Sequence, residues 1–272
     1  MIPSNFDFVR AGSVDEALAA LTEHGDEAKL IAGGHSLLPL MKLRLAIPGV
    51  LIDVAGLHEL SYVKVDGDDV AIGAATRHYE LQASSVAKDE VPLLAHVAGL
   101  VGDPQVRHRG TIGGTVAHAD SASDIPTALL ALDAKIIAQG PNGKREIAAT
   151  GFYLGFFETV LEPDEMIVEI RVPKLGSSVG WGYEKFVRRD NDWPIVAVAA
   201  VNGKVALANM AGTVMRAAAT EQALSSGASI EDAAAVAHEG TSPSSDMHAD
   251  ADYRHHLARL LTGRALHTAA GA

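Results

Sequence analysis

The sequence predicts an α+β protein with an N-terminal α/β unit, a mixed α+β middle unit and a small C-terminal α+β domain. In the first unit, short strand-like and helix-like segments alternate. Two hairpin patterns follow in the middle unit, and three strand-like segments precede the last helical ones. A linker-like stretch lies at 174–178, so we place the units at 1–54, 55–175 and 179–272.

In the N-terminal unit, Ser13-Val-Asp-Glu16 is a capping box that predicts a helix through Leu21. Strands are expected at 29–32 and 50–54, with a helix at 37–43 between them. Gly33 and Gly34 follow the first of these strands. Open α/β sheets usually bind ligands at the carboxyl ends of their strands, so this loop is a candidate binding site.

The middle unit is predicted to combine hairpins with helices. Strands are expected at 62–65, 70–74, 135–138, 145–148 and 166–172, and helices at 79–83, 93–101 and 125–132. Residues 107–124 and 158–163 are expected to be loops. In the C-terminal domain, strands at 182–187, 195–201 and 205–210 form a three-stranded antiparallel sheet, helices occupy 214–224, 230–237 and 253–266, and 239–252 is a loop.

The composition excludes several classes of protein. The chain has 272 residues and a formal net charge of −12, which disfavours nucleic acid as a partner. It contains no cysteine, so it forms no disulfide and supplies no thiolate to an iron–sulfur cluster. The N-terminus lacks the pattern of a signal peptide and no apolar run is long enough to span a membrane, which predicts a cytoplasmic protein that a complex could bring to a membrane.

The stretch 107–124 has the composition of an anion-binding cradle. Gly110, Gly113 and Gly114 lie among Thr111 and Thr115, so positive φ angles, close approach of a ligand and hydroxyl donors are all available. A helix is expected directly after it, and the N–H groups at that helix's N-terminus should face the same ligand.

A second pair of glycines lies earlier, in Ala32-Gly33-Gly34-His35-Ser36. Two such junctions suggest a ligand with two phosphates or a long polyhydroxyl body. Neither stretch matches the dinucleotide fingerprint or the phosphate loop of nucleotide triphosphatases. The alternative is two tight turns that need glycine for their geometry.

These residues together resemble a known family. Ala32-Gly-Gly-His-Ser36, Thr111-Ile-Gly-Gly114 with Asp124 ten residues later, Lys185 before Arg188-Arg189, and Tyr253-Arg254 are similar to the FAD-binding subunit of the molybdenum hydroxylases. The Gly-Gly-His-Ser form most resembles the medium subunit of aerobic carbon monoxide dehydrogenases. The resemblance covers nearly the whole chain and implies an FAD-binding PCMH-like fold for the first two units.

The resemblance also implies partners and a place in electron transfer. A large subunit would carry molybdenum with molybdopterin cytosine dinucleotide, a small one would carry two [2Fe–2S] clusters, and the complex would be a dimer of heterotrimers. Electrons would pass from the clusters to FAD on this chain and then to an acceptor such as a quinone. The lack of cysteine agrees, and it argues against the benzoyl-CoA reductase branch, whose flavin subunit adds cysteines for an extra cluster.

By position, the resemblance implies contacts of FAD with two groups of residues and four single ones. The residues are Ala32, Gly33, Gly34, His35, Ser36, Leu37, Thr111, Ile112, Gly113, Gly114, Thr115, Asp124, Ile167, Lys185 and Trp193. The first two groups would hold the pyrophosphate and ribityl chain through backbone donors and hydroxyls. No catalytic residue is expected on this chain, because the flavin itself would do the redox chemistry. No metal ligand is expected either, because His35, His118 and the other single histidines lack metal-site spacing.

The four single positions each have a simpler alternative. Asp124 would accept from a ribityl hydroxyl, or only cap its helix. Ile167 would pack on the flavin or adenine, or only on the core. Lys185 would stabilise charge on the reduced ring, or be a solvated surface lysine. Trp193 would stack on the ring, or anchor its loop.

One position departs from the family pattern, because many relatives have Asn or Asp where this chain has Thr115. A hydroxyl must then serve in place of a carboxylate or amide. Two other functions stay open: the flavin subunit of an aldehyde, xanthine or N-heterocycle hydroxylase, and a non-redox nucleotide-binding scaffold. The sequence of this chain does not identify the substrate or the electron acceptor.

Overall fold

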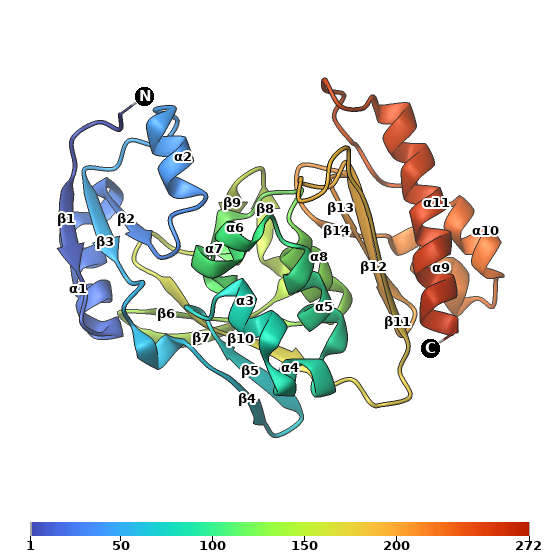
Figure 1. Cartoon of the computed structure of the whole chain (residues 1–272), viewed down its shortest axis with the longest axis horizontal. Coiled ribbons are helices and arrows are strands. Elements are labelled where there is room, and N and C mark those ends of the chain that lie inside the picture. The colour runs from blue at the N-terminus through green and yellow to red at the C-terminus, as the bar shows by residue number, and fades with distance from the viewer. Residues whose placement is uncertain (1, 272) are drawn as a thin grey trace.

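The computed structural model describes residues 2–271 and contains three main sheets (Figure 1). The N-terminal unit is a three-stranded parallel sheet in the order β1-β3-β2. Its elements are β1 (Asp7–Arg10), α1 (Val14–His24), β2 (Ala28–Ile31), α2 (Leu37–Lys42) and β3 (Val50–Asp53). The capping box is confirmed in part: Ser13 Oγ accepts from the Glu16 amide, while the Glu16 carboxylate accepts from Gly12. Strand β1 was not predicted.

The middle unit is a five-stranded antiparallel sheet in the order β4-β5-β10-β6-β7, with helices on one face. The strands are β4 (Val63–Asp66), β5 (Asp69–Gly73), β6 (Lys135–Gly140), β7 (Gly143–Ala148) and β10 (Met166–Pro173), and the helices are α3 (His78–Ala83), α4 (Ser85–Glu90), α5 (Pro92–Leu100), α6 (Pro104–Arg109), α7 (Ile112–His118) and α8 (Asp124–Ala131). A two-stranded hairpin, β8 (Tyr153–Gly155) and β9 (Glu158–Thr159), completes the unit. Both predicted hairpins of the sheet are confirmed.

Residues 107–124 are not the loop that the sequence suggested, because they contain the end of α6 and all of α7. Asp103 caps α6 through the Val106 amide, and Pro104 occupies the first turn. Thr111 caps α7 in the same way through the Gly114 amide. Glycine is a poor helix former, so two glycines in seven residues hid a helix that its cap and its packing stabilise.

The C-terminal domain is a four-stranded antiparallel sheet with helices on its outer face (Figure 1). Its elements are β11 (Trp181–Phe186), β12 (Val196–Val201), β13 (Lys204–Ala208), β14 (Met215–Arg216), α9 (Ala218–Ser225), α10 (Ile230–Ala235) and α11 (Ala251–Ala270). The sheet was predicted with three strands and has a fourth, β14. The helix predicted at 214–224 begins only at Ala218, because the residues before it form that strand. Met215 and Arg216 extend the sheet beside Leu207 and Ala206, because the free edge of β13 offers hydrogen bonds that a short helix would forgo.

The strand β12 lies between two layers of the core. Alternate residues face opposite sides of a strand. Ala197 and Ala199 pack with the helices of the middle unit, whereas Val196 and Val198 pack against α11. All six residues of β12 are buried, so the C-terminal sheet is held directly against the middle unit. Within residues 2–271, no helix is long and apolar enough to cross a membrane.

Candidate cofactor site

The first junction, residues 32–37, joins the end of β2 to the start of α2. Gly34 has a φ of 76°, a conformation that favours glycine, and its carbonyl accepts from the Leu38 amide. The His35 ring turns back to the Gly33 carbonyl, with 3.1 Å between Nδ1 and the oxygen. Within residues 2–271, five consecutive amides donate no hydrogen bond: those of Gly33, Gly34, His35, Ser36 and Leu37. Such a row of free donors suits an anion.

The second junction, residues 109–115, joins α6 to the first turn of α7. Gly110 has a φ of −61°, and Gly113 and Gly114 are helical, so the positive φ angles expected for these glycines are not found. Gly113 is needed for another reason: a Cβ there would lie 2.8 Å from the Ala74 carbonyl oxygen.

The backbone donors expected at the second junction are largely used within the chain. The Ile112 amide donates to Thr76 and the Gly113 amide to Ala74, each at 2.9 Å. The Gly114 amide donates to Thr111 Oγ1 at 3.2 Å. The second junction therefore offers mainly hydroxyl groups and an open surface. Gly114 is exposed, and an added Cβ would meet only Thr111 Oγ1 within 4 Å.

The two junctions lie in contact, although they are far apart in the sequence. A Cβ on Gly33 would lie 2.2 Å from the Arg109 carbonyl oxygen and 2.8 Å from Gly110 Cα. Only a glycine permits this approach between backbones. Gly33, the first of the five residues with free amides, therefore lies against the start of the second junction, an arrangement that a single diphosphate bound by both would require. We call the two junctions together the junction site.

The guanidinium of Arg107 binds backbone carbonyls of its own chain, so it is not available to bind an anion. It donates to the Val101 and Gly102 carbonyls at 3.1 and 3.2 Å, which holds the loop before α6. The free amides and hydroxyls are thus the main donors, in keeping with the net charge of −12.

Asp124 and Lys185 come together, from the first residue of α8 and from β11. Lys185 Nζ lies 2.9 Å from Asp124 Oδ2, and the Tyr183 hydroxyl donates to Oδ1 at 2.6 Å. Burial raises the pKa of Asp124, and Lys185 and the hydrogen bond from Tyr183 oppose this shift. Lys185 also donates to the Leu100 carbonyl. Its side chain is only 10% exposed, so the alternative of a solvated surface lysine is wrong.

Ile167 and Trp193 occupy opposite environments. Ile167 is 6% exposed and belongs to the core between the five-stranded sheet and its helices, which agrees with the simpler interpretation. Trp193 lies between β11 and β12 and is 68% exposed, so its ring does not anchor the loop in the core. The flavin contacts of both residues stay predictions.

Three residues that contact predicted site residues were not singled out from the sequence: Thr76, His78 and Tyr183. Tyr183 lies two residues before Lys185 on one strand, and this spacing places both on one face, so alternation could have identified it. Thr76 and His78 contact the second junction only through the tertiary fold. Their positions in the sequence carry no such signal.

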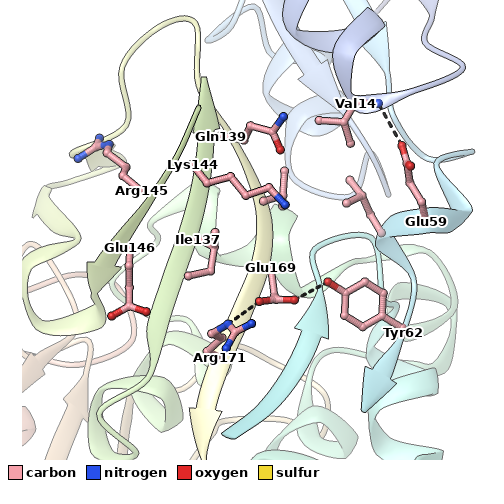
Figure 2. Close-up of a pocket in the computed structure, with 12 residues that line it drawn as sticks. Val14, Glu59, Tyr62, Ile137, Gln139, Lys144, Arg145, Glu146, Glu169 and Arg171 are labelled. Carbon is pink, nitrogen blue, oxygen red and sulfur yellow. Dashed lines mark hydrogen bonds and ion pairs between the residues drawn. The ribbon is translucent and has the colours of Figure 1, made fainter. Parts of the chain in front are cut away.

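A cavity of about 540 Å³ lies elsewhere, and Figure 2 shows twelve residues that line it. Ile137 and Val168 place it on the face of the five-stranded sheet toward the N-terminal unit, away from the helices. Its central polar groups pair with one another: Glu169 accepts from Tyr62 and from Arg171, each at 2.6 Å. No residue of the junction site lines it. Across residues 2–271, no group of three or more His, Cys, Asp or Glu could hold a metal ion.

Comparisons with known proteins agree with this organisation. Residues 4–175 match the family described as FAD binding domain in molybdopterin dehydrogenase. Residues 181–269 match the CO dehydrogenase flavoprotein C-terminal domain.

Similar proteins extend along the whole chain. The carbon monoxide dehydrogenase medium chain of Hydrogenophaga pseudoflava is 41% identical over 99% of this chain and 98% of its own. The 6-hydroxypseudooxynicotine dehydrogenase complex subunit alpha of Paenarthrobacter nicotinovorans is 38% identical, covering 98% and 95%. A solved carbon monoxide dehydrogenase from H. pseudoflava superposes with a TM-score of 0.96 at 43% identity, covering 100% of this chain and 99% of the other.

Proposed function

Because this chain belongs to the family of FAD-binding medium subunits of molybdenum hydroxylases, we propose that it holds FAD at the junction site and transfers electrons within such an enzyme. Electrons would arrive from the [2Fe–2S] clusters of a partner subunit and leave to an external acceptor such as a quinone. Bound FAD supplies the redox chemistry, and the residues of the chain bind and orient it.

The observation that carries the proposal is the contact between the two junctions. Gly33, which begins the row of five free amides, contacts Arg109 and Gly110 just before Thr111, and Gly114 is exposed without a side chain. These donors fit the acceptor oxygens of a diphosphate. The remaining predicted contacts, from Asp124, Ile167, Lys185 and Trp193, would then surround the ribityl chain and the ring.

The test is uptake of FAD by the purified chain, alone and with its partner subunits. The protein is expected to be yellow and to release FAD on denaturation. Gly114→Val is expected to block uptake while the circular dichroism spectrum is retained. Gly151→Val is the matched control, since a Cβ there meets no heavy atom within 4 Å. A colourless wild type that takes up no FAD would instead support the non-redox scaffold.

The proposed partners are a large molybdenum-cofactor subunit and a small [2Fe–2S] subunit, in a dimer of heterotrimers in the cytoplasm. Exposed apolar side chains on this chain support a partner surface, among them Leu45 at 73%, Ile47 at 63% and Phe156 at 65% exposure. Co-purification with the small subunit tests this. A chain that stays monodisperse alone and does not bind that subunit would contradict it.

We propose carbon monoxide as the substrate of the whole enzyme. The carbon monoxide dehydrogenase relative is only slightly more similar than the one named for 6-hydroxypseudooxynicotine, at 41% against 38% identity. The substrate would bind on the large subunit, so the activity of the assembled enzyme must be measured to identify it. Reduction of an artificial acceptor by carbon monoxide is expected, and reduction only by an aldehyde, xanthine or an N-heterocycle would favour the alternative.

A further inference from the structure

His78 lies directly beneath the second junction. It is the first residue of α3, it is 1% exposed, and its Nε2 lies 3.0 Å from Thr115 Oγ1. Its ring also fills the space beside Gly110, where a Cβ would lie 2.9 Å from His78 Cδ2. The backbone holds this position, because the His78 amide donates to the Gly110 carbonyl at 3.1 Å.

The surroundings of the ring decide which nitrogen carries the proton. Within residues 2–271, Nδ1 of His78 is buried and has no hydrogen-bond partner. A proton on Nδ1 would therefore be a buried donor without an acceptor, which costs free energy. With the proton on Nε2, the ring donates to Thr115 Oγ1 and no donor is left unpaired. Burial, followed by the charge of Arg107, lowers the pKa of His78 to about 4, so the ring is neutral at pH 7.

A donor at His78 leaves the Thr115 hydroxyl free to donate. Among residues 2–271, Thr115 Oγ1 has no other hydrogen-bond partner. Thr115 is partly exposed and follows Gly114, whose surface is open. The hydroxyl proton can thus point to a group outside the chain, and only an acceptor fits it. A phosphate oxygen is such an acceptor.

We propose that His78 is a positioning residue that orients the Thr115 hydroxyl as a donor to the diphosphate of FAD. This rests on the proposed function of the junction site and adds a residue to it.

The test is a double-mutant cycle on the full chain freed of FAD, with dissociation constants measured by flavin fluorescence and calorimetry. His78→Leu removes the donor and is expected to raise the Kd for FAD about tenfold. Thr115→Val is expected to do the same. In the Thr115→Val background, His78→Leu should add little, because the hydroxyl that it orients is gone.

Two conservative variants and two ligands separate positioning from a general loss of structure. His78→Gln retains a donor at similar reach, and Thr115→Ser retains the hydroxyl, so each should keep the Kd within about threefold. ADP carries the diphosphate and should show the same cycle as FAD. Riboflavin lacks phosphate and should show no effect of His78→Leu.

An unchanged Kd in His78→Leu, or equal losses in both Thr115 backgrounds, would overturn the role of His78 while leaving FAD binding intact. An effect on riboflavin equal to that on FAD would also overturn it, since the contact would not be to phosphate. If the wild type binds neither FAD nor ADP, with partner subunits present, the proposed function itself fails.

Discussion

Lys185 Nζ lies 2.9 Å from Asp124 Oδ2, and this pair joins the C-terminal sheet to the first residue of α8. Both side chains are nearly buried, at 10% and 6% exposure. A carboxylate in such a position is stable only with its partners. The pair therefore links the middle unit, which carries the second junction, to the C-terminal domain, which carries Trp193.

We expect Lys185→Met to destabilise the protein by about 3 kcal/mol, because it leaves the Asp124 carboxylate buried without a cation. Urea unfolding measures the loss. Arg189→Met is the matched control, since the side chains of its ion pair with Asp192 are 79% and 33% exposed and their loss should change the stability little. Asp124→Asn combined with Lys185→Met should recover part of the loss. Equal effects of Lys185→Met and Arg189→Met would contradict a buried pair.

Stability should fall between pH 7 and pH 5 because of His78. Burial and Arg107 lower its pKa to about 4 in the folded state, whereas the unfolded value is about 6.5. The unfolded state thus binds more protons than the folded state in this range. The free energy of unfolding should therefore be about 2 kcal/mol lower at pH 5 than at pH 7. Unfolding of the wild type and of His78→Gln at both pH values measures it. His78→Gln should lose less stability than the wild type between pH 7 and pH 5. If both lose the same amount, a group other than His78 causes the pH dependence.

Gly33→Ala should separate the two junctions. Its Cβ would lie 2.2 Å from the Arg109 carbonyl oxygen, so the backbone must shift, and we expect a loss of both stability and FAD content. Gly49→Ala is the control, because the nearest atom to its Cβ belongs to the Glu27 side chain at 3.4 Å. FAD released per chain and the midpoint of thermal unfolding are the measurements. Normal FAD content in Gly33→Ala would mean that the contact is not needed for binding.

Trp193→Ala should leave stability almost unchanged, within about 0.5 kcal/mol, because the ring is 68% exposed. If the ring stacks on the flavin, the variant should show brighter flavin fluorescence, since an indole in contact with the flavin quenches it. Trp181→Phe serves as the control for the other tryptophan, which packs against His96. Unchanged fluorescence in Trp193→Ala would argue against the stacking contact.

The elements that follow strong local patterns could be predicted from the sequence. Both hairpins of the middle sheet, the capped helix after Ser13 and the long helix near the C-terminus have local signals that agree with their final environment. Signals for α6 and α7 were also present, in Asp103-Pro104 and in the cap Thr111, but the glycines obscured them. The edge strand at Met215 depended on a partner strand rather than on its own residues.

By itself the sequence determined most of the helices and strands, the two glycine junctions and the resemblance to flavin subunits, because propensity, capping and spacing act over a few residues. Only the tertiary structure decided that Gly33 rests on Arg109, that Lys185 reaches Asp124 and that His78 lies behind Thr115. These pairs are separated by many residues, and they meet because sheets and helices pack on shared cores. No local pattern records that packing.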